Sequence, residues 1–275
     1  MRRLLVLAAC LAVGIALGAF GGAFAGDKGG DHRSFGAQGE LVDLSYPFNE
    51  DTIYWPTATE FTLTQVAEGE TEGGYYYAAN DFAAAEHGGT HLDAPVHFAR
   101  GGDTADELPL ERLVGDAVVV DVSRRALADR DYLITKADLR DWERRNGRIS
   151  PGSIVLLRTG FGQYWPDAER YLGTAERGPD AVPLLHFPGL GEDGARWLVK
   201  RRAVKAVGID TASIDYGQST DFLSHRVLGA ADTPVFENVA HMDQLPSRGF
   251  HVVALPMKIE GGSGGPVRII AVLRS

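Results

Sequence analysis

The sequence predicts a single α/β domain. Short runs of aliphatic and β-branched residues alternate along the chain with charged segments of helical spacing, and such intermingling is typical of the α/β class. No internal repeat, coiled-coil heptad or second composition regime interrupts residues 41–275. We therefore expect one domain over that range, which is long enough to bury a substantial hydrophobic core.

The expected elements follow from local patterns. Short apolar runs bounded by turn residues predict strands at 41–44, 116–121, 153–157, 206–209, 251–255 and 267–273. Charged segments with helical spacing predict helices at 136–146 and 192–202. Gly147 is the expected C-cap of the first helix, since glycine is the residue most common directly after a helix.

The N-terminus has the pattern of a secretory signal peptide. Arg2 and Arg3 precede an apolar stretch over 4–17, and Ala23-Phe24-Ala25 forms an A-x-A cleavage signature. We expect residues 1–25 to be removed by cleavage after the last of these alanines. The protein is therefore predicted to be periplasmic or secreted.

Cys10 is the only cysteine of the chain. Lipidation at Cys10 is one alternative to cleavage, although little apolar sequence precedes it, and retention as a membrane anchor is another. Cleavage after Ala25 would leave no thiol, which excludes disulfides, cysteine-ligated zinc and cysteine nucleophiles. The glycine-rich polar stretch at 26–40 is expected to be a flexible leader.

The charge balance argues against nucleic-acid binding. The formal net charge is −10, and the sequence contains no basic run with interleaved aromatic residues. We therefore expect no nucleic-acid partner, and no membrane association once the signal segment is removed.

Residues 87–98, HGGTHLDAPVHF, hold three of the eight histidines. A glycine turn that enters an extended segment would bring His87 round to His91 and place Asp93 on the face of His91, because alternate residues of a strand share a face. Imidazole and carboxylate together suit zinc, manganese or iron, and three protein ligands leave a position open for water. His97 could ligate, or act beside the metal as a proton shuttle. The alternative is a solvated loop, which the addition of an aspartate and a third histidine to the His-x-x-x-His pair disfavours.

Other motifs carry less weight. Residues 261–265 match G-x-S-x-G, the nucleophile elbow of serine hydrolases, but no helix pattern, histidine or acidic residue follows them. We interpret this stretch as a flexible loop. The isolated histidines His186, His241 and His251 have no patterned partners and are expected to be structural.

The histidine cluster resembles the H-x-G-T-H-x-D-x-P-x-H signature of the cyclase-like metal-dependent hydrolase family, which includes bacterial kynurenine formamidase and isatin hydrolase. The likeness continues in the expected order through 153–165, 207–215, 224–239 and 254–273. It therefore covers nearly all of the chain after the leader. The resemblance implies a swivelling β/β/α fold and a homodimer or higher homo-oligomer.

The resemblance also implies roles for the clustered residues. His87, His91 and Asp93 match the ligands of a first metal, with the aspartate reaching towards a second. His97 matches the catalytic acid/base. One or two divalent ions, zinc or manganese, are implied, and the sequence leaves their number and identity open.

Residues outside the cluster are included by the same resemblance. His225 and Glu237 match the histidine and the bridging glutamate of the second metal, whereas their residues alone would fit a surface pair and a structural ion pair equally well. Trp55 matches a tryptophan that contacts substrate. Tyr54 and Phe98 could extend an aromatic wall, and ordinary core packing is the alternative for such side chains.

The function predicted from these residues is metal-dependent hydrolysis of an amide C–N bond in a small aromatic molecule. An arylformamide such as N-formylkynurenine and a cyclic amide such as isatin are the two leading substrates. A lactone hydrolase or polyketide cyclase is an alternative, because an activated water attacks esters as well as amides. A non-catalytic, metal-dependent periplasmic binding protein is a third possibility, which a proton-shuttle histidine disfavours.

Overall fold

The computed structural model of the protein describes residues 39–274. The predicted signal peptide, 1–25, and all of the predicted leader before residue 39 lie outside the described residues. Within the described part of the chain, no helix combines the length and the apolar character needed to cross a lipid bilayer.

The strands and helices alternate along the chain. The strands are β1 Leu41–Asp43, β2 Thr62–Glu70, β3 Tyr76–Ala83, β4 His91–Asp93, β5 Val114–Asp121, β6 Leu133–Ile134, β7 Ile154–Arg158, β8 Gly189–Leu190, β9 Ala206–Ile209, β10 Val235–Glu237, β11 Arg248–Pro256 and β12 Gly264–Leu273. The helices are α1 Leu110–Leu113, α2 Ser123–Ala126, α3 Lys136–Asn146, α4 Ala168–Leu172, α5 Glu192–Trp197 and α6 Leu223–Gly229. Short helical turns are η1 Pro95–His97, η2 Phe161–Tyr164, η3 Pro179–Leu184, η4 Leu198–Arg202 and η5 Met242–Gln244.

One mixed sheet organises the fold. Its eight strands have the order β1-β12-β11-β5-β7-β9-β10-β4, and a further pairing of β4 with β12 closes the sheet on itself. The strands β5, β7, β9 and β10 run parallel, and the remaining pairs are antiparallel. Strand β12 closes the sheet because it is long enough to pair with β4 through Gly264–Pro266 and with β11 through Val267–Leu273. The predicted α/β class is therefore confirmed, as a mixed α/β fold around a closed sheet.

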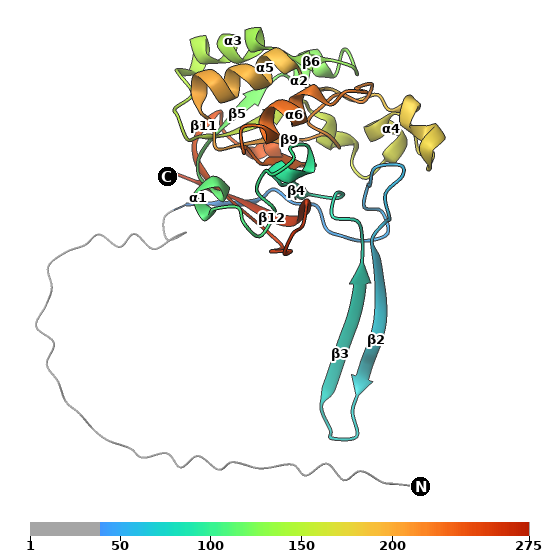
Figure 1. Ribbon diagram of the computed structural model, residues 1–275. Helices are drawn as coiled ribbons and strands as arrows, with labels where there is room; N and C mark the ends of the chain where they lie inside the picture. The colour runs from blue at the N-terminus through green and yellow to red at the C-terminus, as the bar shows by residue number, and fades with distance from the viewer. Residues whose placement is uncertain (1–38, 275) are drawn as a thin grey trace, which may run out of the picture. The chain divides into compact units, whose positions relative to one another are not determined.

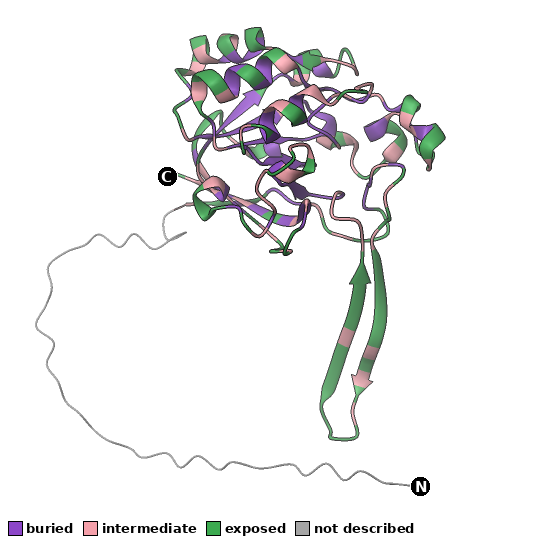
Figure 2. Ribbon diagram, in the orientation of Figure 1, coloured by how far each residue is buried: buried purple, intermediate pink, exposed green. Residues whose placement is uncertain are grey.

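The sheet separates two hydrophobic cores. In β5, Ala117 and Val119 point into the closed sheet, and Val118 and Val120 point out towards the helices, as the two-residue period of a strand requires. The outer core includes Trp142 of α3 and side chains of α5 and α6, which lie together on one side of the sheet (Figure 1). Figure 2 accordingly shows buried strands beneath helices that are buried along one side only.

Most predicted elements occur within a few residues of their expected bounds. The helix over 136–146 is present as α3, and Gly147 caps it with a φ of 85°. The segment expected to be one helix over 192–202 divides into α5 and the π-helical turn η4, which ends at Ala203 with a φ of 47°. The stretch 261–265, expected to be a loop, is only partly one, because Gly264 begins β12.

Strands β2 and β3 form a hairpin that the sequence pattern does not predict. The two strands pair with each other and with no strand of the closed sheet. Figure 1 shows the hairpin projecting from the rest of the described chain, and Figure 2 shows both strands almost wholly exposed. Alternation between polar and apolar residues is weak here because neither face of the hairpin packs on a core.

Candidate metal centre

The register between β4 and β10 brings three polar side chains together. Glu237 of β10 lies directly opposite His91 of β4, and Asp93 is two residues further along β4. Paired residues and alternate residues of a strand share a face of the sheet, so these three side chains project to the same side. The intervening Leu92 and Phe236 belong to the core inside the closed sheet. Local strand geometry thus places two carboxylates and an imidazole on one face.

The imidazole of His91 has a free nitrogen at this face. Its Nδ1 donates to the backbone carbonyl of Gly89 at 2.9 Å, which fixes the ring. Its Nε2 lies 3.2 Å from Oδ1 of Asp93 and 3.4 Å from Oε2 of Glu237, yet it is buried without an aligned hydrogen-bond partner. Burial alone would lower the pKa of His91, but the two carboxylates outweigh it and raise this pKa to about 10. The site therefore favours a positive charge between these groups.

His225 approaches the same carboxylates from α6. Its Nδ1 lies 2.7 Å from Oδ2 of Asp215, a carboxylate that also accepts the backbone N–H of His225 at 3.0 Å. This anchor makes Nδ1 the donor and leaves Nε2 as the free nitrogen. Nε2 lies 3.0 Å from Oδ2 of Asp93 and 3.1 Å from Oε1 of Glu237. Burial opposes protonation of His225, but these three carboxylates raise its pKa well above the ordinary value.

His87 reaches Asp93 from the turn before β4. Its Nδ1 lies 2.6 Å from Oδ1 of Asp93, and its Nε2 lies 2.8 Å from the hydroxyl oxygen of Ser263. That hydroxyl donates to Oε2 of Glu86 at 2.6 Å, because a carboxylate can only accept. The Ser263 oxygen then accepts from Nε2–H of His87. Two acceptors, Nδ1 and the carboxylate, therefore face each other at a distance that requires a shared cation.

These donor sets fit a divalent metal. Two groups of ligand atoms lie within 4.8 Å of one another among the described residues: one of His87, Asp93 and His97, and one of His91, Asp93 and Glu237. The predicted set of His87, His91 and Asp93 is thus divided between two groups that share the aspartate. Imidazole nitrogen with carboxylate oxygen is a donor set that suits zinc and manganese.

His97 lies at the rim of this centre. Its ring stacks on that of His87, with 3.9 Å between the ring centroids. Although part of the ring faces solvent, the surrounding protein lowers the pKa of His97 to about 4 by desolvation, and the cationic forms of His87 and His225 lower it further. The imidazole is therefore neutral near pH 7 and able to accept a proton.

A cavity of about 280 Å³ opens over the centre. Its apolar wall includes Trp55 and Phe98, both predicted from the sequence, and Phe222, which was not predicted. Tyr54 differs from the expectation: its ring is buried against Gly88 and does not line this cavity. Adjacent residues of an extended segment point to opposite sides, so Trp55 faces the cavity and its neighbour does not.

Four further residues support the site, and sequence reasoning missed them. Asp215 holds His225, and Ser263 with Glu86 holds His87. Asn238 lines the cavity and donates to the carbonyl of Gly89 at 2.6 Å. No local spacing marks these residues, because strand pairing brings them together from distant parts of the chain. Asp215 ends a block, 207–215, that already carried the family resemblance, and this was the one available signal.

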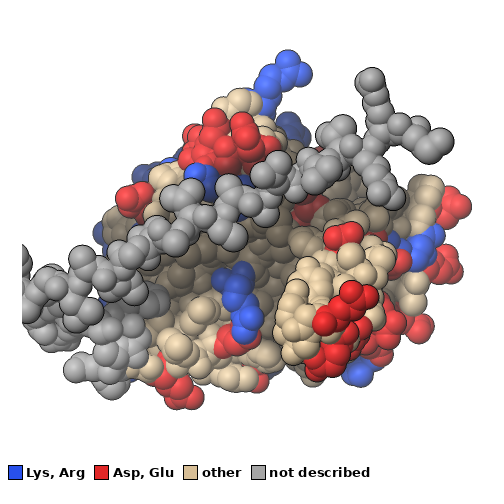
Figure 3. Space-filling view, turned by 90° about the horizontal axis from the view of Figure 1, so that it is seen from below, with Lys and Arg blue, Asp and Glu red and all other residues tan. Residues whose placement is uncertain are grey.

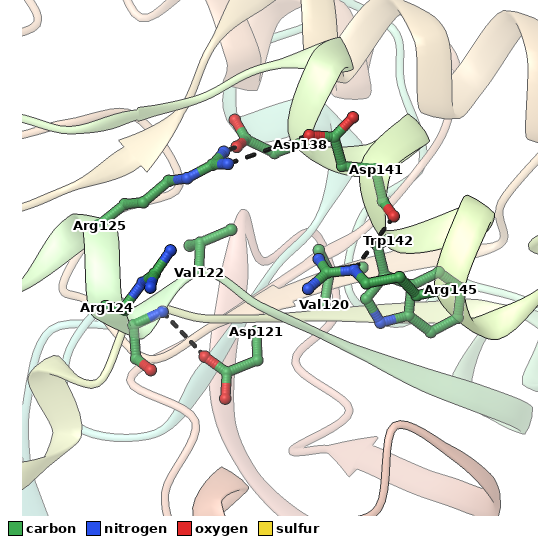
Figure 4. Close-up of a pocket in the computed structure, with 10 residues that line it drawn as sticks. Val120, Asp121, Val122, Arg124, Arg125, Asp138, Asp141, Trp142 and Arg145 are labelled. Carbon is green, nitrogen blue, oxygen red and sulfur yellow. Dashed lines mark hydrogen bonds and ion pairs between the residues drawn. The ribbon is translucent and has the colours of Figure 1, made fainter.

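A second cavity has the opposite character. It has a volume of about 440 Å³ and lies between β5, α2 and α3 (Figure 4). Its carboxylates have cationic partners: Asp138 pairs with Arg125, and Asp121 pairs with Arg158. Because their charges are already compensated, these carboxylates offer no unsatisfied ligand, and the histidine-lined cavity is the better candidate for chemistry.

Comparison with known proteins agrees with the geometry. The family model described as Cyclase matches residues 42–216. The chain belongs to the cyclase family. Isatin hydrolase from Roseibium aggregatum is 31% identical over 77% of this chain and 80% of that protein. Kynurenine formamidase from Salinibacter ruber is 32% identical over 85% of this chain and 97% of that protein.

Solved structures share the fold of this cyclase-family chain. Isatin hydrolase A from Ralstonia solanacearum is 32% identical and superposes with a TM-score of 0.77 over 86% of this chain and 92% of that one. An isatin hydrolase solved with the product analogue thioisatinate has a TM-score of 0.78 at 27% identity over 86% of this chain and 94% of that one. These relatives are hydrolases, and this member of the cyclase family is an enzyme of that class.

Proposed function

We propose that the protein is a metal-dependent hydrolase that cleaves the amide C–N bond of a small aromatic substrate. The observation that carries the proposal is the convergence of three anchored imidazoles on Asp93 and Glu237 at the floor of an aromatic-lined cavity. Relatives named isatin hydrolase and kynurenine formamidase support an amide of an aromatic compound as the substrate.

The proposed cofactor is one or two divalent ions, zinc or manganese. The ligands would be His87, His91, His225, Asp93 and Glu237. Such an ion, when bound, lowers the pKa of a water molecule and polarises a substrate carbonyl. Because the aspartate belongs to both groups of ligand atoms, it would bridge the two ions if both are present.

The chain's own residues supply the proton transfers and the substrate position. His97, neutral at pH 7, would accept a proton from the attacking water and deliver it to the leaving nitrogen. Trp55, Phe98 and Phe222 would contact the aromatic ring of the substrate and exclude water around the scissile bond. The cavity suits a substrate with one or two rings, given its volume of about 280 Å³.

The test combines metal analysis with a substrate panel. The purified protein is assayed with N-formylkynurenine, isatin and simple lactones, each with added manganese or zinc. We expect turnover of an amide, with elemental analysis giving one or two metal ions per chain. Turnover of lactones alone would move the assignment to an ester hydrolase. A metal-loaded protein that turns over none of them would support the binding-protein alternative instead.

We further propose that the protein is exported and homo-oligomeric. The support for export is the A-x-A signature ending at Ala25, and cell fractionation with N-terminal sequencing of the mature protein tests it. The support for a homo-oligomer is the exposed β2–β3 hairpin, and sedimentation velocity over a range of concentrations tests it.

A further inference from the structure

The β2–β3 hairpin is acidic and aromatic. No lysine or arginine occurs between residues 34 and 99, and the hairpin carries Glu68, Glu70 and Glu72 at and near its turn. Large apolar side chains accompany these charges, and more than half the surface of each is exposed: Leu63, Val66, Tyr75, Tyr76, Tyr77 and Phe82. Figure 3 views the molecule from the side to which the hairpin projects, and acidic side chains gather there.

This hairpin has no core of its own. None of the residues from 62 to 83 is buried, and Leu63 pairs across the strands with Phe82 on an open face. An isolated two-stranded hairpin is marginally stable in water, and a contiguous exposed apolar surface usually marks an interaction site. The nine residues of β2 span roughly 30 Å at the usual rise per residue, so the turn lies far from the closed sheet. A partner is therefore needed to cover it.

A groove elsewhere on the chain has the complementary character. It has a volume of about 690 Å³ and is formed by η1, α5, η4 and α6 with the residues that flank them. Its rim carries Arg100, Arg196, Lys200 and Arg226, and none of its lining residues is acidic. Apolar side chains form its floor, Val199 and Leu223 among them. Such a groove accepts a segment that combines carboxylates with tyrosines.

We propose that the hairpin of one copy of this chain docks in the cationic groove of a second copy. Glutamates at the turn would meet the arginine and lysine side chains of the rim, and tyrosines would pack on the apolar floor. Tyrosine and arginine are enriched at protein interfaces for this combination of apolar area and polar contact. The opposite charges of the two surfaces select a second copy rather than a like-charged partner.

The docked hairpin would lie beside the metal centre. Phe98 lines both the groove and the cavity over the metal ligands, so one aromatic ring separates the two. A partner's hairpin would therefore hold this ring against the cavity. The inference rests on the proposed homo-oligomer and not on the catalytic proposal, because association is measured independently of turnover.

Sedimentation velocity on charge-reversed variants of the full chain tests this docking. One variant carries Glu68→Lys, Glu70→Lys and Glu72→Lys, and another carries Arg100→Glu and Lys200→Glu. All five side chains are exposed, so the fold should persist, which circular dichroism checks. We expect each variant to weaken self-association at least about tenfold, because like charges would then face each other. Mixing the two variants should restore association through one matched hairpin–groove contact.

The control reverses a second cationic cluster. Arg140→Glu with Arg148→Glu changes the rim of another surface hollow beside α3 and should leave association unchanged. Loss of association in this control, or failure of the mixture to recover, would overturn the proposed groove. A chain that is monomeric at every concentration would overturn the homo-oligomer as well. Metal content and turnover, measured on the same samples, test the hydrolase proposal separately.

Discussion

The hydroxyl of Ser263 fixes which nitrogen of His87 faces the metal centre. It donates to Glu86 at 2.6 Å and accepts from Nε2 of His87 at 2.8 Å, so Nδ1 is turned to Asp93. The loop is shaped for this contact, since a Cβ on Gly264 would lie 2.6 Å from the His87 ring. A serine that formally completes a nucleophile motif thus serves to orient a ligand.

Replacement of Ser263 by alanine should weaken metal binding. Without the hydroxyl, Nε2–H of His87 loses its acceptor, and the ring is free to turn or change tautomer. Loss of such a supporting contact costs about 10–100-fold in metal affinity. Competition with a chromophoric chelator measures the change. Ser247→Ala, which removes a serine that hydrogen-bonds to Asn146 away from the site, is the control and should keep the affinity of the unmodified chain.

Asp215→Asn should act on the second imidazole in the same direction. The carboxylate holds Nδ1 of His225 at 2.7 Å, whereas an amide of the same shape carries no charge to support a cation at Nε2. We expect a loss of metal affinity of about tenfold or more. The matched control is Asp131→Asn, because Asp131 makes an equivalent contact with His186 outside the site. Equal losses in both variants would show a general structural effect instead.

His97→Ala should separate metal binding from turnover. We expect metal content to stay at its original level, and kcat to fall about 10²–10⁴-fold, the usual contribution of a general acid/base. His251→Ala removes a histidine that pairs with Asp116 far along the sheet and should leave kcat unchanged. Loss of one metal equivalent from the His97→Ala protein would instead identify this imidazole as a ligand, in line with its place in a group with His87 and Asp93.

Removal of metal by a chelator should lower the melting temperature. The carboxylates of Asp93 and Glu237 are buried together, and a bound cation compensates their charge. A metal present at a thousandfold excess over its Kd stabilises the folded state by about 4 kcal/mol, which corresponds to roughly 10 °C for a chain of this size. Differential scanning calorimetry before and after chelation gives the shift, and added zinc or manganese should reverse it.

Asp138 should contribute stability that depends on pH. Burial tends to raise the pKa of Asp138, but hydrogen bonds from Thr135 and Tyr132, with the nearby Arg125, outweigh it and hold this pKa below the ordinary value. Since the folded-state pKa is the lower one, the stabilisation is complete above a pH of about 4 and is lost as the pH falls through the folded-state value.

Urea unfolding of Asp138→Asn tests this dependence. At pH 7 we expect the free energy of unfolding to fall by about 1–3 kcal/mol, because the amide cannot replace a carboxylate that accepts several hydrogen bonds at the start of α3. The difference from the unmodified chain should shrink at a pH of about 3. A difference that stays constant over this range would show that the carboxyl pKa is not shifted by folding.

The sequence predicts the local features of this chain well. The helix over 136–146 and its cap at Gly147 follow from spacing and from the conformational freedom of glycine, both properties of adjacent residues. His91 and Asp93 are found on one face because a strand repeats every two residues. The family resemblance added His225 and Glu237, which the structure brings to within 3.1 Å of each other and which no local pattern connects.

Features that depend on distant pairing could not be predicted. Ser263 meets His87 only because β12 pairs with β4, and Asp215 meets His225 only because α6 follows the end of β9 closely in space. The β2–β3 hairpin gives no alternating pattern because both its faces are open. Tyr54 was grouped with Trp55 by aromatic character, and the side to which each points depends on the extended backbone.

Closure of the sheet by β12 sets the order in which the site can be assembled. The ligands of β4 are made early in synthesis, but their neighbours Gly264–Pro266 belong to the final strand. A growing chain therefore holds its histidines and carboxylates apart until its last residues leave the ribosome. Metal capture must follow completion of the whole polypeptide, and trimming of the C-terminus would disable ligands that lie at the other end of the chain.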